Sequence, residues 1–134
     1  MKLGKRSLQA LSTGCDELYT VAHAAIELGL IDFTVLECHR EEERQNTLFD
    51  EGKSKVRFPN GKHNKLPSDA ADIAPYVNGK ISWDYRHCIF LSGVLVTVAA
   101  KMGINLRWGG NWDMDGEPMT DQGFQDLVHY EVIR

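Results

Sequence analysis

The chain has 134 residues and a mass of 15.1 kDa, which is the size of one ordinary domain. Hydrophobic residues make up 43% and charged residues 25%, a balance typical of a globular protein with a buried core and not of a disordered chain. The 15 basic and 19 acidic residues are interspersed and give a net charge of −4, which argues against a nucleic-acid binder with a basic stripe. We therefore expect one domain over residues 1–134, which acts as a monomer and has no nucleic-acid partner.

The N-terminal segment begins with basic side chains, as a signal peptide does. The residues that follow, Ser7–Thr13, are too polar and too short for the apolar core of such a peptide. Cys15 resembles the cysteine of a lipoprotein box, but Ser12 stands where that box has an aliphatic residue. The longest apolar run, Cys88–Ala100, is too short to span a bilayer. We expect no signal peptide and no stable association with a membrane.

Hydrophobic periodicity and turn residues predict the elements of the first half of the chain. These are a helix around Leu18–Ile26 that Gly29 ends, a strand over 33–38, a polar surface helix over 41–51 closed by Gly52, and a basic loop over 53–68. The three cysteines are odd in number and far apart, at positions 15, 38 and 88. They predict reduced thiols of a protein made in the cytosol, and neither a disulfide framework nor a cysteine zinc site.

The second half of the chain predicts more strands and one long helix. These are a strand around 70–74, a tight turn at Val77–Lys80, a buried helix from Ser82 or Asp84 to Met102 that Gly103 ends, a strand over 104–108, a loop over 109–125 and a strand over 127–133. The turn is expected because Asn78-Gly79 accepts positive φ values. Helices and antiparallel strands are mixed without βαβ regularity, so the predicted class is α+β.

Five histidines are the first candidates for chemistry. His23 and His87 fall inside predicted helices and are interpreted as surface or packed helix residues. His39 ends a predicted strand, and its role stays open. His63 and His129 differ from these, because both lie in or beside polar segments that also contain carboxylates.

A zinc site is one interpretation of these two segments. His63 in a loop and Asp72 on a strand supply two donors that suit zinc, with Asp69 as a competing carboxylate. On a strand, His129 and Glu131 share one face, although a solvated polar face is the simpler explanation of that pair alone. Three protein ligands with an open position are typical of a catalytic zinc.

The motifs together resemble those of the phage zinc endolysins that are L-alanyl-D-glutamate endopeptidases. This family is related to zinc D-alanyl-D-alanine carboxypeptidases and dipeptidases and to the Hedgehog signalling domain. The resemblance covers about residues 30–134 and rests on His63, on Asp-Ala-Ala-Asp-Ile-Ala-Pro-Tyr at 69–76, on Arg-Trp-Gly-Gly-Asn-Trp-Asp at 107–113 and on Asp126-x-x-His129-x-Glu131. It implies a small antiparallel sheet flanked by helices.

The resemblance also implies the roles of site residues. The zinc ligands would be His63, Asp72 and His129. Asp126 would be the catalytic carboxylate, and Arg40 would lie near the substrate carbonyl, where its alternative is an ion pair with Glu37 or Glu43.

Two carboxylates compete for one role near the last histidine. Strand alternation alone ranks Glu131 above Asp126, because Glu131 lies beside His129. The resemblance reverses that order and requires Asp126 to lie in the loop just before the strand. Glu131 then lies behind the metal ligands or faces the substrate.

The sequence departs from the family pattern before the second ligand. Gly61 replaces a serine, Ser68 replaces a glycine, and His63 and Asp72 are further apart than the family's pair. An insertion around Leu66-Pro67 explains the spacing. It affects the expected shape of the substrate cleft more than the metal site.

The implied reaction is zinc-dependent hydrolysis of a peptide bond in peptidoglycan stem peptides. The enzyme would act on the cell wall from the host cytoplasm, after another factor has opened the membrane. One alternative is a D-alanyl-D-alanine carboxypeptidase or dipeptidase, and another is a non-catalytic, zinc-stabilised module that binds the cell wall or belongs to the virion. Asp126 and Arg40 argue against the module, because a pure binder needs neither.

A calcium site is a separate hypothesis for the segment after the tryptophan-rich motif. Oxygen-bearing side chains at alternate positions, followed by Gly116, reproduce the first half of an EF-hand loop. The second half fits poorly, because Gln122 occupies the last ligand position. The candidate ligands are Asn111, Asp113, Asp115, Glu117 and Asp121. The alternative is a solvated acidic loop.

Overall fold

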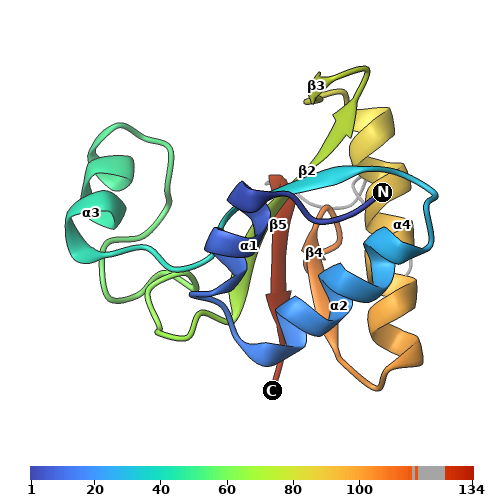
Figure 1. Ribbon diagram of the computed structural model, residues 1–134. Coiled ribbons are helices and arrows are strands. Elements are labelled where there is room, and N and C mark those ends of the chain that lie inside the picture. Colours follow the sequence, from blue (N-terminus) through green and yellow to red (C-terminus); the bar gives the residue numbers. More distant parts are fainter. Residues whose placement is uncertain (116, 118–125) are drawn as a thin grey trace.

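The computed structural model describes residues 1–115, 117 and 126–134. Its elements in chain order are α1 (Lys5–Leu11), α2 (Asp16–Glu27), β1 (Phe33–Glu37), α3 (Glu42–Asp50), β2 (Ala70–Val77), β3 (Lys80–Ile81), α4 (Tyr85–Lys101), β4 (Leu106–Gly109) and β5 (Asp126–Val132). Four strands form a sheet in the order β1-β2-β5-β4, every neighbouring pair antiparallel, and β3 pairs with β2 (Figure 1). The predicted α+β class, with an antiparallel sheet and helices beside it, is confirmed.

The two faces of the sheet have different roles, because side chains alternate along each strand. Ile73 and Tyr130 belong to the hydrophobic core on the face that α2 and α4 cover. Their neighbours Asp72 and His129 therefore point to the opposite face. In Figure 1, α3 and the loop after it lie on the left, away from α2 and α4. The core and the polar face are thus separated by the thickness of one sheet.

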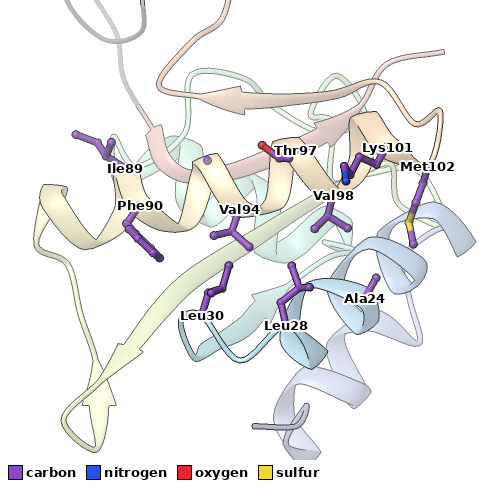
Figure 2. Close-up of a pocket in the computed structure, with 11 residues that line it drawn as sticks. Ala24, Leu28, Leu30, Ile89, Phe90, Val94, Thr97, Val98, Lys101 and Met102 are labelled. Carbon is purple, nitrogen blue, oxygen red and sulfur yellow. The ribbon is translucent and has the colours of Figure 1, made fainter.

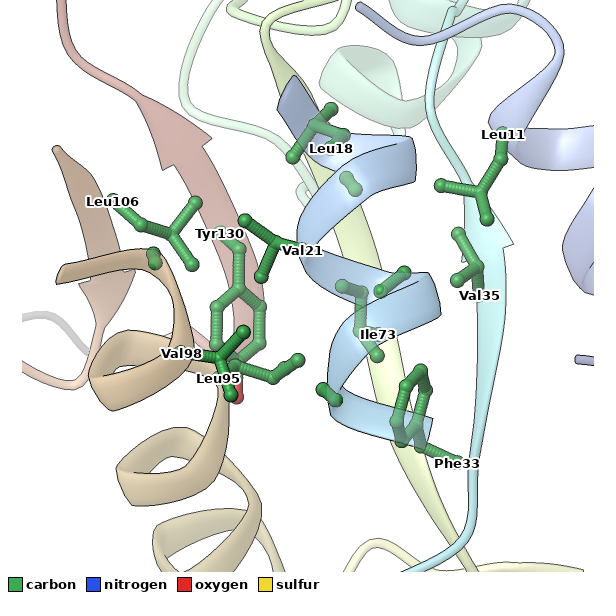
Figure 3. Packing of buried hydrophobic residues seen from close by; sticks show 14 of the residues in the cluster. Leu11, Leu18, Val21, Phe33, Val35, Ile73, Leu95, Val98, Leu106 and Tyr130 are labelled. Atoms are coloured by element: carbon green, nitrogen blue, oxygen red, sulfur yellow. The ribbon is translucent and has the colours of Figure 1, made fainter. Parts of the chain in front are cut away.

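The core forms around α2. Its apolar residues recur at helical spacing and are at most 2% exposed: Leu18, Val21, Ala22, Ala25 and Ile26. Figure 3 shows α2 between Leu95 and Val98 of α4 on one side and Phe33 and Val35 of β1 on the other. Burying each large aliphatic side chain contributes about 1.5–3 kcal/mol to folding. This packing holds the strands that carry the polar face.

One predicted turn and one predicted helix cap are confirmed. Asn78 and Gly79 have φ values of 53° and 79° in the turn between β2 and β3, as the Asn-Gly pair predicts. The carboxylate of Asp84 accepts a hydrogen bond from the backbone of Arg86 and so caps α4. Of the two predicted caps, Asp84 is therefore the one that α4 uses. None of the described helices is both long and apolar enough to cross a membrane.

The sequence did not predict α1. Leu11 of this helix is buried in the core, and the hydroxyl of Ser7 accepts a hydrogen bond from the backbone N–H of Val35. The following residues are tied to the loop before β2, because the N–H of Cys15 bonds the carbonyl of Ser68 at 2.8 Å. All three cysteines are free, as predicted, and they are buried.

The strand boundaries shift by a few residues from those predicted. β2 continues to Val77 because it pairs with β1 and then with β3. β4 starts at Leu106, and β5 starts at Asp126. The last shift matters for the site, because it places Asp126 inside the strand and not in the loop before it.

Candidate metal centre

Three side chains from different elements meet on the polar face of the sheet. Asp72 of β2 and His129 of β5 are cross-strand partners, so their side chains lie side by side. His63 comes from the loop between α3 and β2, and its Nε2 lies 3.3 Å from Oδ1 of Asp72. The Nδ1 atom of His129 lies 3.8 Å from the same oxygen. The three donor atoms fall within 4.8 Å of one another, close enough to bind one metal ion.

A hydrogen bond to its second ring nitrogen orients each histidine. Nδ1 of His63 lies 2.7 Å from the carbonyl of Cys38, and Nε2 of His129 lies 3.0 Å from Oε1 of Glu131. Each contact places a proton on that nitrogen and leaves the other nitrogen, which faces Asp72, as the one that can bind a metal ion. Metal-binding histidines are commonly held in this way by a carbonyl or a carboxylate.

The polar atoms at the centre fit a cation. Nε2 of His63 and Oδ1 of Asp72 are buried and have no hydrogen-bond partner among the described residues. Leaving such atoms unsatisfied costs about 1–3 kcal/mol each, which a bound ion would offset. Two imidazoles and one carboxylate form a donor set that suits zinc.

The charges around the centre also favour a cation. Burial lowers the pKa of His129, but the neighbouring carboxylates of Asp72 and Glu131 outweigh burial and raise this pKa to about 9, so a metal ion bound here would take the place of the proton on Nδ1. Burial raises the pKa of Asp72, but the neighbouring His129 and His63 and the charge of Arg40 bring it below its usual range. Asp72 is therefore ionised at neutral pH and needs to lose no proton to bind a metal.

Arg40 is held beside the metal ligands by two carboxylates. Its Nη2 donates to Oδ2 of Asp72 at 3.0 Å, and its Nε donates to Oε1 of Glu37 at 2.5 Å. Its backbone N–H also bonds the carbonyl of His63 at 2.7 Å. The ion pair with Glu37, which the sequence left as an alternative, is therefore present, and Arg40 also contacts a candidate ligand.

Glu131 is buried, so the solvated polar face that the sequence favoured for it is wrong. Its side chain is 3% exposed and accepts hydrogen bonds from His129 and from Nη2 of Arg107, the latter at 3.2 Å. Arg107 also donates to the carbonyl of Trp112 at 3.3 Å. The ring of Trp112 lies 5.3 Å from that of His129. Glu131 and Arg107 thus link β4 and β5 behind His129.

Asp126 is the first residue of β5 and not the last residue of the preceding loop, which corrects the predicted position. It pairs with Gly109, where the register between β4 and β5 shifts. A Cβ atom on Gly109 would lie 2.0 Å from the carbonyl oxygen of Asp126, so only glycine fits at this close approach. Burial raises the pKa of Asp126, as does the charge of Asp72.

A cavity of about 260 Å³ opens beside the candidate ligands. His63, His129 and Asp126 line it on the side of the sheet. Trp112, Arg40 and residues of the loop after α3 complete its wall. A substrate group in this cavity would lie next to both the metal centre and Asp126.

The remaining candidate residues lie elsewhere. Asp69 accepts hydrogen bonds from Lys65 and Arg134, so Asp72 is the carboxylate at the centre. Nδ1 of His39 lies 3.1 Å from the carbonyl of Lys65. His23 pairs with Glu27, and His87 contacts the hydroxyl of Ser82. None of these three histidines lies in the cluster of donor atoms that the described residues form.

The candidate calcium segment is only partly described. Oδ1 of Asn111 is buried and has no hydrogen-bond partner in the described part of the chain. Oδ1 of Asp115 accepts a hydrogen bond from the backbone of Glu117 at 2.9 Å. The proposed turn residue Gly116 and the candidate ligand Asp121 lie outside the described residues.

Sequence reasoning missed Gln45 of α3. This side chain is fully buried, and its amide donates to the hydroxyl of Ser54 and the carbonyl of Val56. Its Oε1 accepts hydrogen bonds from Asn64 and Arg40. Gln45 therefore ties the loop to α3, although nothing in a polar helix sequence distinguishes it from its exposed neighbours.

A larger cavity lies away from the metal centre. It is a groove of about 660 Å³ between the end of α2 and one side of α4 (Figure 2). Leu28, Leu30 and Phe90 line it and are at least half exposed. Lys101 is the one charged residue in its described lining, and no histidine, cysteine or carboxylate side chain is among those lining residues. The candidate metal ligands His63 and His129 line the smaller cavity instead.

The chain is similar to known proteins over nearly its whole length. Residues 1–133 match the family of phage L-alanyl-D-glutamate peptidases. The chain is 33% identical over 135 residues to the L-alanyl-D-glutamate peptidase of Escherichia phage T5, which covers 98% of both chains. The fold is similar to the crystal structure of the Serratia marcescens L-Ala D-Glu endopeptidase ChiX, with a TM-score of 0.80 and 23% identity, over 99% of this chain and 90% of that one.

Proposed function

Because the chain belongs to the phage L-alanyl-D-glutamate peptidase family, we propose that it is a zinc-dependent hydrolase of the L-alanyl-D-glutamate bond in peptidoglycan stem peptides. The observation that supports this most strongly is the meeting of His63, Asp72 and His129 beside a cavity. Two of their buried donor atoms have no hydrogen-bond partner in the described structure. We propose that these three residues hold the zinc ion.

Zinc bound there would supply a water molecule whose pKa is lowered toward about 7. Asp126 accepts a proton from the attacking water as its oxygen bonds to the alanyl carbonyl carbon. It then returns the proton to the glutamate nitrogen as the carbon–nitrogen bond breaks. This role is supported by the place of Asp126 in the cavity wall that His63 and His129 also form.

Arg40 and Glu131 have supporting roles in this proposal. The guanidinium of Arg40 lines the cavity and stabilises negative charge that develops on the carbonyl oxygen. Glu131 does not take part in proton transfer, because its carboxylate already accepts hydrogen bonds from His129 and Arg107. It fixes the ring of His129 so that Nδ1 faces the metal.

Removal and return of the metal tests the proposal. Protein stripped with a strong chelator should lose its ability to solubilise purified peptidoglycan and should regain it with one equivalent of zinc. His63→Ala, Asp72→Ala and His129→Ala should each bind less zinc, because a site with three protein ligands loses much of its affinity with any one of them. Full activity in protein shown by metal analysis to contain no zinc contradicts the proposal.

We also propose that the segment from Asn111 to Glu117 binds calcium. The buried, unpartnered Oδ1 of Asn111 supports this, together with the alternating carboxylates Asp113 and Asp115. Calcium bound to this segment would raise the activity of the zinc-loaded enzyme. Titration calorimetry on the wild type and on Asp113→Ala/Asp115→Ala tests this, and absence of calcium binding to the wild type contradicts it.

A further inference from the structure

The cavity beside the candidate metal ligands is lined in part by a basic loop. His129 and Asp126 of β5 line it, as do His63 and other residues of the loop between α3 and β2. Residues 53–65 of this loop contain five of the chain's 15 basic residues and none of its 19 acidic residues. This loop is thus positively charged, whereas the whole chain has a net charge of −4.

Three lysines of that loop line the cavity. Lys53 pairs with Glu51 at 3.4 Å, so its charge is partly balanced from within the loop. Nζ of Lys62 lies 4.0 Å from Oε2 of Glu131, the outer limit of an ion pair. The carboxylate of Glu131 already accepts hydrogen bonds from Arg107 and His129, so these bonds satisfy it without an ion pair to Lys62. Lys55, the third of them, also lines the cavity.

The backbone that carries these lysines is anchored to α3. Gln45 bonds Ser54 and Val56, on either side of Lys55, at 2.8 and 2.7 Å. The N–H of Gly61, next to Lys62, bonds Oδ1 of Asn64 at 2.8 Å. The backbone at Lys55 and Lys62 is therefore held in place beside the candidate metal centre, and the long side chains of these two lysines reach the cavity from it.

The proposed substrate contains an anionic group that these lysines could bind. In an L-alanyl-D-glutamate unit the glutamate provides the leaving amine. Glutamate has two carboxyl groups, and only one of them can continue the peptide chain. The other remains as a free carboxylate within a few bonds of the scissile nitrogen, unless it is amidated. An anion at that position suits lysine, which acts as a compact point charge.

We propose that Lys55 and Lys62 form a subsite that binds the free carboxylate of the residue on the amine side of the cleaved bond. The subsite rests on the proposed function, and it makes the enzyme selective for stem peptides whose glutamate is not amidated. The lysines determine specificity and take no part in proton transfer. Their effect therefore appears in KM more than in kcat.

Two synthetic stem peptides test the subsite with the zinc-loaded full chain. They differ in one group, which is a free carboxylate on the glutamate in one peptide and an amide in the other. We expect the wild type to cleave the carboxylate peptide about tenfold more efficiently in kcat/KM, the size expected from two partly exposed charge contacts. Lys55→Gln/Lys62→Gln should lose most of this preference through a higher KM, with unchanged zinc content.

The control variant is Lys80→Gln/Lys101→Gln, which makes the same change in net charge outside the cavity. It should keep the wild-type preference. Equal cleavage of the two peptides by the wild type, or an undiminished preference in Lys55→Gln/Lys62→Gln, overturns the subsite and leaves the peptidase function intact. Cleavage of neither peptide by the zinc-loaded wild type contradicts the peptidase function and the subsite together.

Discussion

Asp126 and Glu131 are both at least partly buried on β5, but they have different partners. Glu131 bonds the ring of His129 and the guanidinium of Arg107. Asp126 lines the cavity, where burial and the charge of Asp72 raise its pKa. The carboxylate of Asp126 is therefore suited to accept and return a proton. The carboxylate of Glu131 already has two hydrogen-bond donors, so it is suited to hold the ring of His129 in place.

Asp126→Asn should therefore keep its zinc and lose turnover. The amide has the shape of the carboxylate but cannot accept a proton, and we expect kcat to fall by about 10²-fold or more. Metal analysis and steady-state kinetics on purified peptidoglycan check both parts. If Asp126→Asn stays active while Glu131→Gln loses all turnover with its zinc retained, the roles of the two carboxylates are reversed.

Arg107 should affect the metal centre without touching it. Arg107→Gln removes the cation beside the buried carboxylate of Glu131 and loosens the orientation of His129. We expect the zinc affinity to fall by about 10- to 100-fold, the usual effect of a residue that supports a metal ligand. Arg107→Lys should restore part of the affinity, and the visible spectrum of cobalt-substituted protein should report the changed ligand geometry. The exposed Arg86→Gln is the control, and equal zinc affinity in both glutamine variants would refute the role of Arg107.

Among the elements, β4 and β5 fix the position of Asp126 by their close approach at Gly109. Gly109→Ala places a Cβ atom 2.0 Å from the carbonyl of Asp126, so the strands must separate. We expect a loss of about 1–3 kcal/mol in stability and a fall in kcat, because the cavity wall moves with Asp126. Gly93→Ala in α4 is the matched control, since nothing lies within 4 Å of its added Cβ. Urea unfolding of the two variants compares them, and equal stability contradicts the argument.

An element can be predicted from the sequence when the residues that stabilise it are close together in the chain. The apolar residues of α2 recur at helical spacing, and Asn78 and Gly79 adopt the positive φ values that a tight turn requires. Both elements can therefore be predicted from the sequence. α1 has seven mostly polar residues and is held by tertiary contacts such as that of Ser7 with β1. A contact between positions so distant in the sequence leaves no local pattern.

The candidate site, too, could be predicted from the sequence only in part. The ligand set His63, Asp72 and His129 follows from the resemblance, and the structure brings these residues together. Alternation on β5 correctly places Glu131 beside His129, but it cannot show that Arg107 of the neighbouring strand neutralises it. The burial of Gln45 depends on how the loop after α3 folds back, which no residue spacing encodes.

In the molecule as a whole, one sheet separates the packed core from the site. The helices α2 and α4 stabilise one face, and the ligands occupy the other. At the surface, Arg134 after β5 bonds Glu17 in the first turn of α2 and Asp69 before β2. These contacts join three distant parts of the chain.

This cluster predicts a dependence of stability on pH. The hydrogen bond from Arg134 lowers the pKa of Glu17 from 4.5 to about 2. A lowered pKa in the folded state contributes stability above pH 4.5, and this contribution is lost as the pH falls toward 2. Glu17→Gln should thus have a lower melting temperature than the wild type at pH 6, and the difference should shrink between pH 4.5 and 2. A difference that stays constant over this range contradicts the assignment.

The identity of the cleaved bond tests the central claim most directly. Purified peptidoglycan is digested with the zinc-loaded protein, and the released amino groups and the masses of the fragments are determined. We predict stem-peptide fragments that begin with D-glutamate, which disappear when zinc is chelated and return when it is added back. Release of single D-alanine residues, or the same fragments from protein that contains no metal, would contradict the account.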